Sequence, residues 1–108
     1  MSERIGKSAE RMLGQLIEQK RRACGLSQMD LGRRINQKQQ QIVKYEAGEF
    51  VPLPVLEAIC AALDTTAPKR LIRRISFLRK LEMETETEQA ELIPLYHEIF
   101  SSDSSLDD

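Results

Sequence analysis

The residues best suited to chemistry in this sequence are the polar run Lys38-Gln39-Gln40-Gln41 and Lys44, which follows it. A glutamine amide carries a donor and an acceptor, which match N6 and N7 of adenine in the major groove of DNA. Gln39, Gln40, Gln41 and Lys44 are therefore candidates for reading the bases of double-stranded DNA. The alternative is a polar helix face that only contacts solvent.

Two short helices joined by a tight turn must position these side chains. Ser27 can accept a hydrogen bond from the backbone N–H three residues on, and Asp30 stands where a capping box has its acidic partner. Asn36 readily takes the left-handed conformation that ends a helix. A second helix follows, with Ile42 and Tyr45 on its inner face. Because an α-helix fits the major groove, this pair could present the polar run to DNA.

A larger set of residues extends this pattern over residues 13–64. Its members are Arg21, Gly25-Leu26-Ser27-Gln28, Leu31-Gly32, Ile42, Glu46, Gly48, Pro52, Leu56, Ile59, Cys60 and Leu63. In their joint spacing they resemble the Cro and phage-repressor family of helix-turn-helix proteins, also called the xenobiotic-response-element family. The resemblance covers about half of the chain and implies an all-α, five-helix, lambda-repressor-like DNA-binding domain. Lys38 departs from the family pattern, because a capping Ser or Thr is usual there.

The resemblance also implies roles for individual side chains. Gln28, in the first turn of the first helix of the pair, is expected to contact a backbone phosphate, since helix N-termini favour anions. Lys38 and Arg33 are further candidates for phosphate contacts. Arg21 is expected to form an ion pair with Glu46 that braces the preceding helix against the end of the recognition helix. The alternative for that pair is that both side chains are solvated.

The charge of the chain is divided into blocks. The formal net charge is −1, although DNA-binding domains are usually basic. Residues 10–64 hold eight basic and seven acidic side chains, residues 65–81 hold six basic and no acidic ones, and residues 82–108 hold nine acidic ones and no Lys or Arg. The total therefore averages two blocks of opposite sign.

The sequence predicts four segments in its 108 residues. These are a flexible arm over 1–8, the helix-turn-helix domain over 9–68, a helical C-terminal extension over 69–100 and a disordered acidic tail over 101–108. Thr65 or Thr66 is expected to cap a long helix that has Pro68 in its first turn and continues to about Glu91. Pro94 is expected to open a last short helix.

Apolar stripes in the extension are candidates for a dimer surface. They consist of Leu71, Ile75, Leu78, Tyr96, Ile99 and Phe100. One domain of this size contacts a short half-site, so specific binding normally requires a two-fold dimer on an inverted repeat. Antiparallel pairing of the long helix would place its basic half beside the acidic half of the partner. The alternative is that these side chains close the core of a monomer.

Other classes of function have little support. We find no nucleophile–base pair with a positioned histidine, no phosphate-binding glycine loop and no metal cluster, so neither an enzyme nor a cofactor is expected. Cys24 and Cys60 are expected to be buried thiols. The sequence has no apolar run long enough for a membrane span and no secretory signal, which predicts a cytoplasmic protein, nucleoid-associated when bound to DNA.

The sequence therefore favours a transcriptional regulator, a dimeric repressor whose partner is operator DNA. Two alternatives belong to other classes. The first is an antitoxin, in which the acidic region from residue 82 onward would bind a protein partner. The second is a protein-interaction adaptor that retains the fold but reads no bases.

Overall fold

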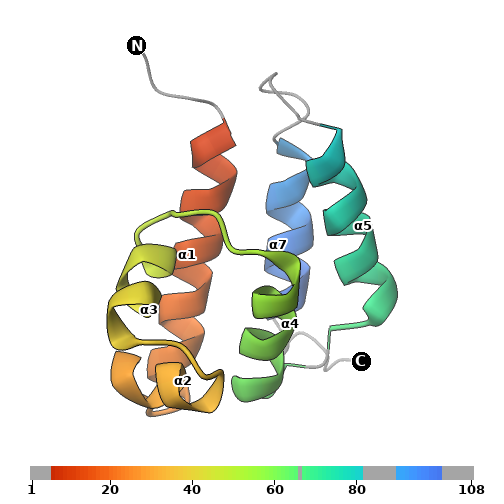
Figure 1. The fold of residues 1–108 in the computed structure, drawn as a ribbon. Coiled ribbons are helices and arrows are strands. Elements are labelled where there is room, and N and C mark those ends of the chain that lie inside the picture. Colours follow the sequence, from red (N-terminus) through yellow and green to blue (C-terminus); the bar gives the residue numbers. More distant parts are fainter. Residues whose placement is uncertain (1–5, 66, 82–89, 101–108) are drawn as a thin grey trace.

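The computed structural model describes residues 6–65, 67–81 and 90–100, and its regular structure there is α-helical (Figure 1). The helices are α1 (Gly6–Ala23), α2 (Gln28–Arg34), α3 (Gln39–Glu46), α4 (Leu53–Ala62), α5 (Lys69–Lys80) and α7 (Leu92–Phe100). The predicted all-α helix-turn-helix fold is confirmed. None of the described helices is both long and apolar enough to cross a membrane.

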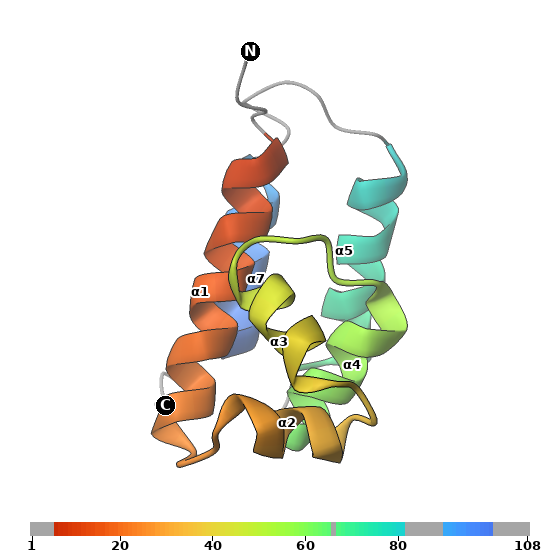
Figure 2. The same cartoon turned by 60° about the vertical axis from the view of Figure 1, so that its left-hand side comes forward.

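The helices pack around one core. α1 and α7 run side by side in the same direction, with α5 against α7 (Figure 1). Figures 1 and 2 place α3 and α7 on different sides of α1. A single buried cluster includes Leu13 of α1, Ile42 of α3, Ile59 of α4, Ile75 of α5 and Tyr96 of α7. The helical extension predicted to follow residue 68 therefore shares its core with the helices before it.

This packing corrects the predicted dimer surface. Five of the six candidates are buried within one chain, namely Ile75, Leu78, Tyr96, Ile99 and Phe100. The reason is that α7 covers the apolar stripe of α5, while α1 covers that of α7. Leu71 is half-buried and is the one candidate that still reaches the surface.

The start of α5 also differs from the prediction. The helix begins at Lys69, after Pro68, which is the N-cap and so precedes the first turn. Thr65 does not cap this helix; its hydroxyl donates to the carbonyl oxygen of Cys60 at 3.1 Å. Thr66 lies outside the described residues. Proline takes the extended conformation of an N-cap readily, but its side chain makes no capping hydrogen bond.

The predicted long helix ends earlier than expected. α5 stops at Lys80, and Leu81 lies in a turn. Residues 82–89 of the predicted continuation, with four of the nine acidic side chains of 82–108, lie outside the described residues. α7 begins at Leu92, so Pro94 lies within its first turn, where a missing N–H costs no helical hydrogen bond.

The two cysteines differ in exposure. Cys60 is buried, as expected, but Cys24 is exposed. The reason is that α1 ends at Ala23, which places Cys24 in the turn that follows. Its thiol donates to the carbonyl oxygen of Leu63 at 3.6 Å.

Arg79 of α5 joins three other parts of the chain. It donates to the carbonyl oxygen of Val51 at 2.6 Å, to Glu10 Oε1 at 3.1 Å and to the Tyr96 hydroxyl oxygen at 3.1 Å. Its guanidinium lies 4.3 Å from the centre of the Phe50 ring. Burial raises the pKa of the Glu10 carboxyl, and the charge of Arg79 acts in the opposite direction. These contacts fix α5 and α7 to α1 and to the loop after α3.

Gly14 allows α1 to touch the end of α3. A Cβ atom at this position would lie 2.6 Å from the carbonyl oxygens of both Tyr45 and Glu46. Real Cβ atoms do not approach backbone oxygens so closely, so α1 and α3 can cross here only because the residue is glycine.

We expect Gly14→Ala to destabilise the protein. At an exposed helical site, replacing Gly by Ala would stabilise it by about 1 kcal/mol. Here the added methyl group must push two backbones apart, and such overpacking costs about 1–3 kcal/mol. Urea unfolding of the variant measures the net loss. Gln15→Ala, at an exposed position of the same helix, should change the free energy of unfolding by about 0.5 kcal/mol or less. A Gly14→Ala protein more stable than the parent would show that α1 and α3 do not meet as described.

Candidate nucleic-acid interface

Local hydrogen bonds fix the start of α2. Ser27 Oγ accepts from the backbone N–H of Asp30 at 3.0 Å, and Asp30 Oδ2 accepts from the backbone N–H of Ser27 at 3.1 Å. This is the capping box that the sequence predicts. The hydrogen bonds from Ser27 hold the pKa of the Asp30 carboxyl below its usual value. The carboxylate is thus engaged in the cap.

The turn between α2 and α3 depends on two small or permissive residues. Asn36 has a φ of 62°, the left-handed conformation expected of it. A Cβ atom at Gly32 would lie 2.5 Å from the carbonyl oxygen of Gln37. Any larger residue would therefore collide with the turn. α3 begins directly afterwards at Gln39, with Lys38 as an N-cap whose side chain makes no capping hydrogen bond.

α3 has one buried and one exposed face. Ile42 and Tyr45 are buried against the core. The exposed side chains at helical spacing are Gln39, Gln40, Val43 and Lys44. Gln41 is half-buried at the edge of this face. The structure thus brings three of the four predicted base-reading residues together on the exposed face of α3 and places the fourth beside them.

A buried ion pair holds the other end of α3. Arg21 Nε lies 2.6 Å from Glu46 Oε2, and the two side chains are only 8% and 5% exposed. A second guanidinium nitrogen donates to Glu46 Oε1 at 3.1 Å, and a third donates to the carbonyl oxygen of Leu26 at 2.8 Å. The hydrogen bond with Glu46 raises the pKa of Arg21. The pair implied by the family resemblance is therefore present, and it is not solvated.

Gln28 has a contact that sequence reasoning missed. Its side-chain amide donates to Glu46 Oε1 at 3.1 Å, so it completes the ion pair between Arg21 and Glu46. The contact joins residues far apart in the sequence, and no local pattern signals it. The predicted phosphate contact of Gln28 stays a prediction, because no DNA is present to test it.

The surface around α3 has an excess of positive charge. Residues 27–48 contain four basic and two acidic side chains. The basic ones are Arg33, Arg34, Lys38 and Lys44, and all four are exposed. Both acidic ones are engaged, Asp30 in the cap and Glu46 with Arg21. In Figure 2 α2 and α3 lie on the near side of the molecule, with no described helix in front of α3. This surface therefore combines amide groups with cations on an uncovered helix.

Comparison with known proteins identifies the same part of the chain. A family model described as a helix-turn-helix domain matches residues 12–71, more than half of the sequence. The match extends from α1 into the first turn of α5. No curated protein and no solved structure matches the chain.

We expect Glu46→Gln to destabilise the protein strongly. The amide keeps the shape of the carboxylate but leaves Arg21 buried without a counter-charge, which costs about 3–5 kcal/mol. Glu18→Gln is the matched control, because it breaks a pair with Arg22 that is nearly as close, at 2.7 Å, but whose side chains are 71% (Arg22) and 37% (Glu18) exposed. The free energy of unfolding of that control should fall by less than about 1 kcal/mol. Chemical denaturation of both variants gives the comparison, and similarly small losses would argue against a structural role for Glu46.

Proposed function

Because the chain belongs to this helix-turn-helix domain family, we propose that it is a transcriptional regulator that binds double-stranded DNA at a specific sequence. The observation that carries the proposal is the exposed face of α3, where Gln39, Gln40 and Lys44 lie together on an uncovered helix. A helix fits the major groove, and side chains near its N-terminus can then reach the base edges.

Each exposed side chain of α3 suits a particular contact. The amides of Gln39 and Gln40 can each pair with N6 and N7 of adenine. Lys44 can donate to guanine or to a phosphate, and the exposed methyl groups of Val43 can pack on a thymine methyl. Gln41, at the edge of the face, would contact a neighbouring base. Gln28, Arg33 and Lys38 would bind phosphates and so fix the register of the protein on the duplex.

A closer relationship to Cro and phage-repressor proteins is also part of the proposal. It is supported by the ion pair between Arg21 and Glu46, which lies at the positions where the resemblance implied one. In such proteins a regulator represses by occupying its operator, and we propose the same mode of action for this chain.

We further propose that two copies bind an inverted repeat with half-sites about 34 Å apart. One α3 reads only a short half-site, which limits the specificity of a single copy. Since most of the predicted dimer residues are in the core, Leu71 alone of that set can contribute to a contact between copies. The pairing we propose therefore depends on the DNA.

Binding to DNA should separate the roles of Gln40 and Lys44. A site is first selected from a random duplex pool, and affinities for that site and for scrambled DNA are then measured at several salt concentrations. Gln40→Ala should lose about 1–3 kcal/mol of discrimination at one base pair and leave binding to scrambled DNA unchanged. Lys44→Ala should weaken binding to both and reduce the salt slope by about 1. Gln15→Ala, an exposed glutamine on α1, is the control and should change neither. Equal losses on both DNAs for Gln40→Ala would contradict base reading.

The stoichiometry on DNA tests the proposed dimer. Light scattering or native mass spectrometry should find two copies on a duplex that carries the selected inverted repeat, and one copy on a duplex with a single half-site. The free protein should be a monomer at micromolar concentration. A single copy bound to the full repeat would contradict the dimeric mode of binding.

A further inference from the structure

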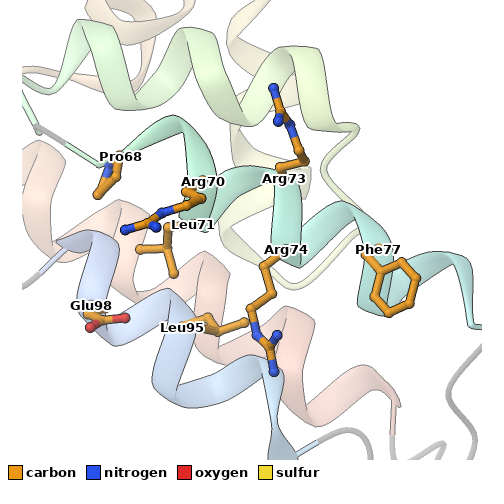
Figure 3. A pocket seen from close by; sticks show the side chains of 8 residues that line it. All are labelled: Pro68, Arg70, Leu71, Arg73, Arg74, Phe77, Leu95 and Glu98. Carbon is orange, nitrogen blue, oxygen red and sulfur yellow. The ribbon is translucent and has the colours of Figure 1, made fainter.

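A groove of about 750 Å³ lies between α5 and α7 (Figure 3). Its floor is apolar, because Leu71 of α5 and Leu95 of α7 line it and both are half-buried. Phe77 extends the apolar surface along α5 and is 59% exposed. An isolated exposed apolar residue is ordinary, but three around one groove form a surface that another molecule could cover.

The rim of this groove is basic. In Figure 3 the side chains of Arg70 and Arg74 extend over it from α5, whereas Arg73 points away from α7. Glu98 is the one acidic side chain among the lining residues that the structure describes. α5 itself carries no acidic residue. The groove therefore presents an apolar floor beside cations and little negative charge of its own.

DNA bound by α3 would not reach this groove. Figures 1 and 2 place α3 and α7 on different sides of α1, and α5 packs against α7. A duplex lying along α3 would therefore be on the far side of the molecule. A phosphate backbone also offers charge but no apolar surface to cover Leu71, Leu95 and Phe77. These features favour a protein as the occupant.

A second copy of the same chain fits the groove poorly. A two-fold contact places one patch against the identical patch. Arg70 and Arg74 would then face their counterparts, and Glu98 is the one acidic side chain among the described lining residues of each copy that could offset them. Like charges brought together in an interface disfavour association.

We propose that the groove between α5 and α7 binds an acidic amphipathic helix of a partner protein. Apolar side chains of that helix, spaced at i, i+3 or i+4 and i+7, would lie on Leu71, Leu95 and Phe77. Its carboxylates would pair with Arg70 and Arg74. Helices that place an apolar face in a groove between two helices are a recurrent mode of recognition. The surface is separate from the DNA-reading face of α3 and does not depend on the proposed function.

The test uses the full chain and two synthetic helical peptides with the same leucines at i, i+4, i+7 and i+11. One peptide has glutamates at the remaining polar positions and the other has lysines. Amide NMR shifts of the labelled protein are followed as each peptide is added. Addition of the acidic peptide should shift the amide signals of α5 and α7 until the shifts saturate. This peptide should bind at least about tenfold more tightly than the basic one. Its affinity should fall as salt is raised.

Variants of the protein test whether the peptide binds in the groove. Arg74→Glu should lower the affinity for the acidic peptide about tenfold. Lys80→Glu is the matched control, because it makes the same charge change at an exposed position of α5 that does not line the groove; it should retain most of the affinity. Leu95→Gln should also weaken binding, through the loss of the apolar floor. Circular dichroism checks that each variant is folded.

Several outcomes would overturn the proposal. One is no saturable shift with the acidic peptide, and another is equal loss from Arg74→Glu and Lys80→Glu, which would indicate a general charge effect. Shifts confined to α2 and α3 would place the peptide on the DNA-reading face. Concentration-dependent shifts of α5 and α7 without peptide would identify a second copy as the occupant, and shifts there on adding a DNA duplex would identify nucleic acid.

Discussion

The buried ion pair between Arg21 and Glu46 is the interaction on which the position of α3 depends. Removing two charges from water is costly, and the pair is tolerable only because its hydrogen-bonding groups find partners. Arg21 donates to both carboxylate oxygens and to the carbonyl of Leu26, while Glu46 also accepts from Gln28. These partners come from α1, α2, α3 and the turn after α1. None of these helices can therefore move far without breaking its hydrogen bonds to the others.

A second arginine secures the chain beyond α3. Arg79 of α5 donates to the carbonyl oxygen of Val51, in the loop that follows α3, and to Glu10 of α1 and Tyr96 of α7. The end of α3 and the loop after it are thus held from two sides by Arg21 and Arg79. A helix that reads bases must keep a fixed orientation on its scaffold, because small displacements break bidentate contacts. In this protein the C-terminal helices contribute to that orientation, although they are remote in sequence from α3.

The features predictable from the chemistry of the residues alone are the local ones, whereas the ion pair between Arg21 and Glu46 is predicted only through the family resemblance. Ser27 and Asp30 form a cap between near neighbours, and Asn36 ends α2 through its own backbone preference, so their chemistry can be read without knowledge of the fold. The apolar stripe that contains Ile75 is different. Its spacing shows that one face of a helix is covered but not by what, and α7 covers it in place of a second copy. The contacts of Arg79 with Glu10 and of Gln28 with Glu46 join distant residues, and no sequence pattern marks them.

The distribution of charge links the two proposed surfaces. A regulator must find its site among a large excess of other DNA, so the ratio of specific to non-specific affinity matters more than affinity alone. Non-specific binding is driven by cations that neutralise phosphates, on whichever face of the protein the DNA lies. Arg70 and Arg74 line the groove between α5 and α7, and cations there would strengthen non-specific binding without contributing to the contacts of α3. An acidic helix in the groove between α5 and α7 would neutralise Arg70 and Arg74 and leave the cations around α3 in place. A partner bound there would therefore increase specificity by weakening non-specific binding, without contacting any of the proposed base-reading residues.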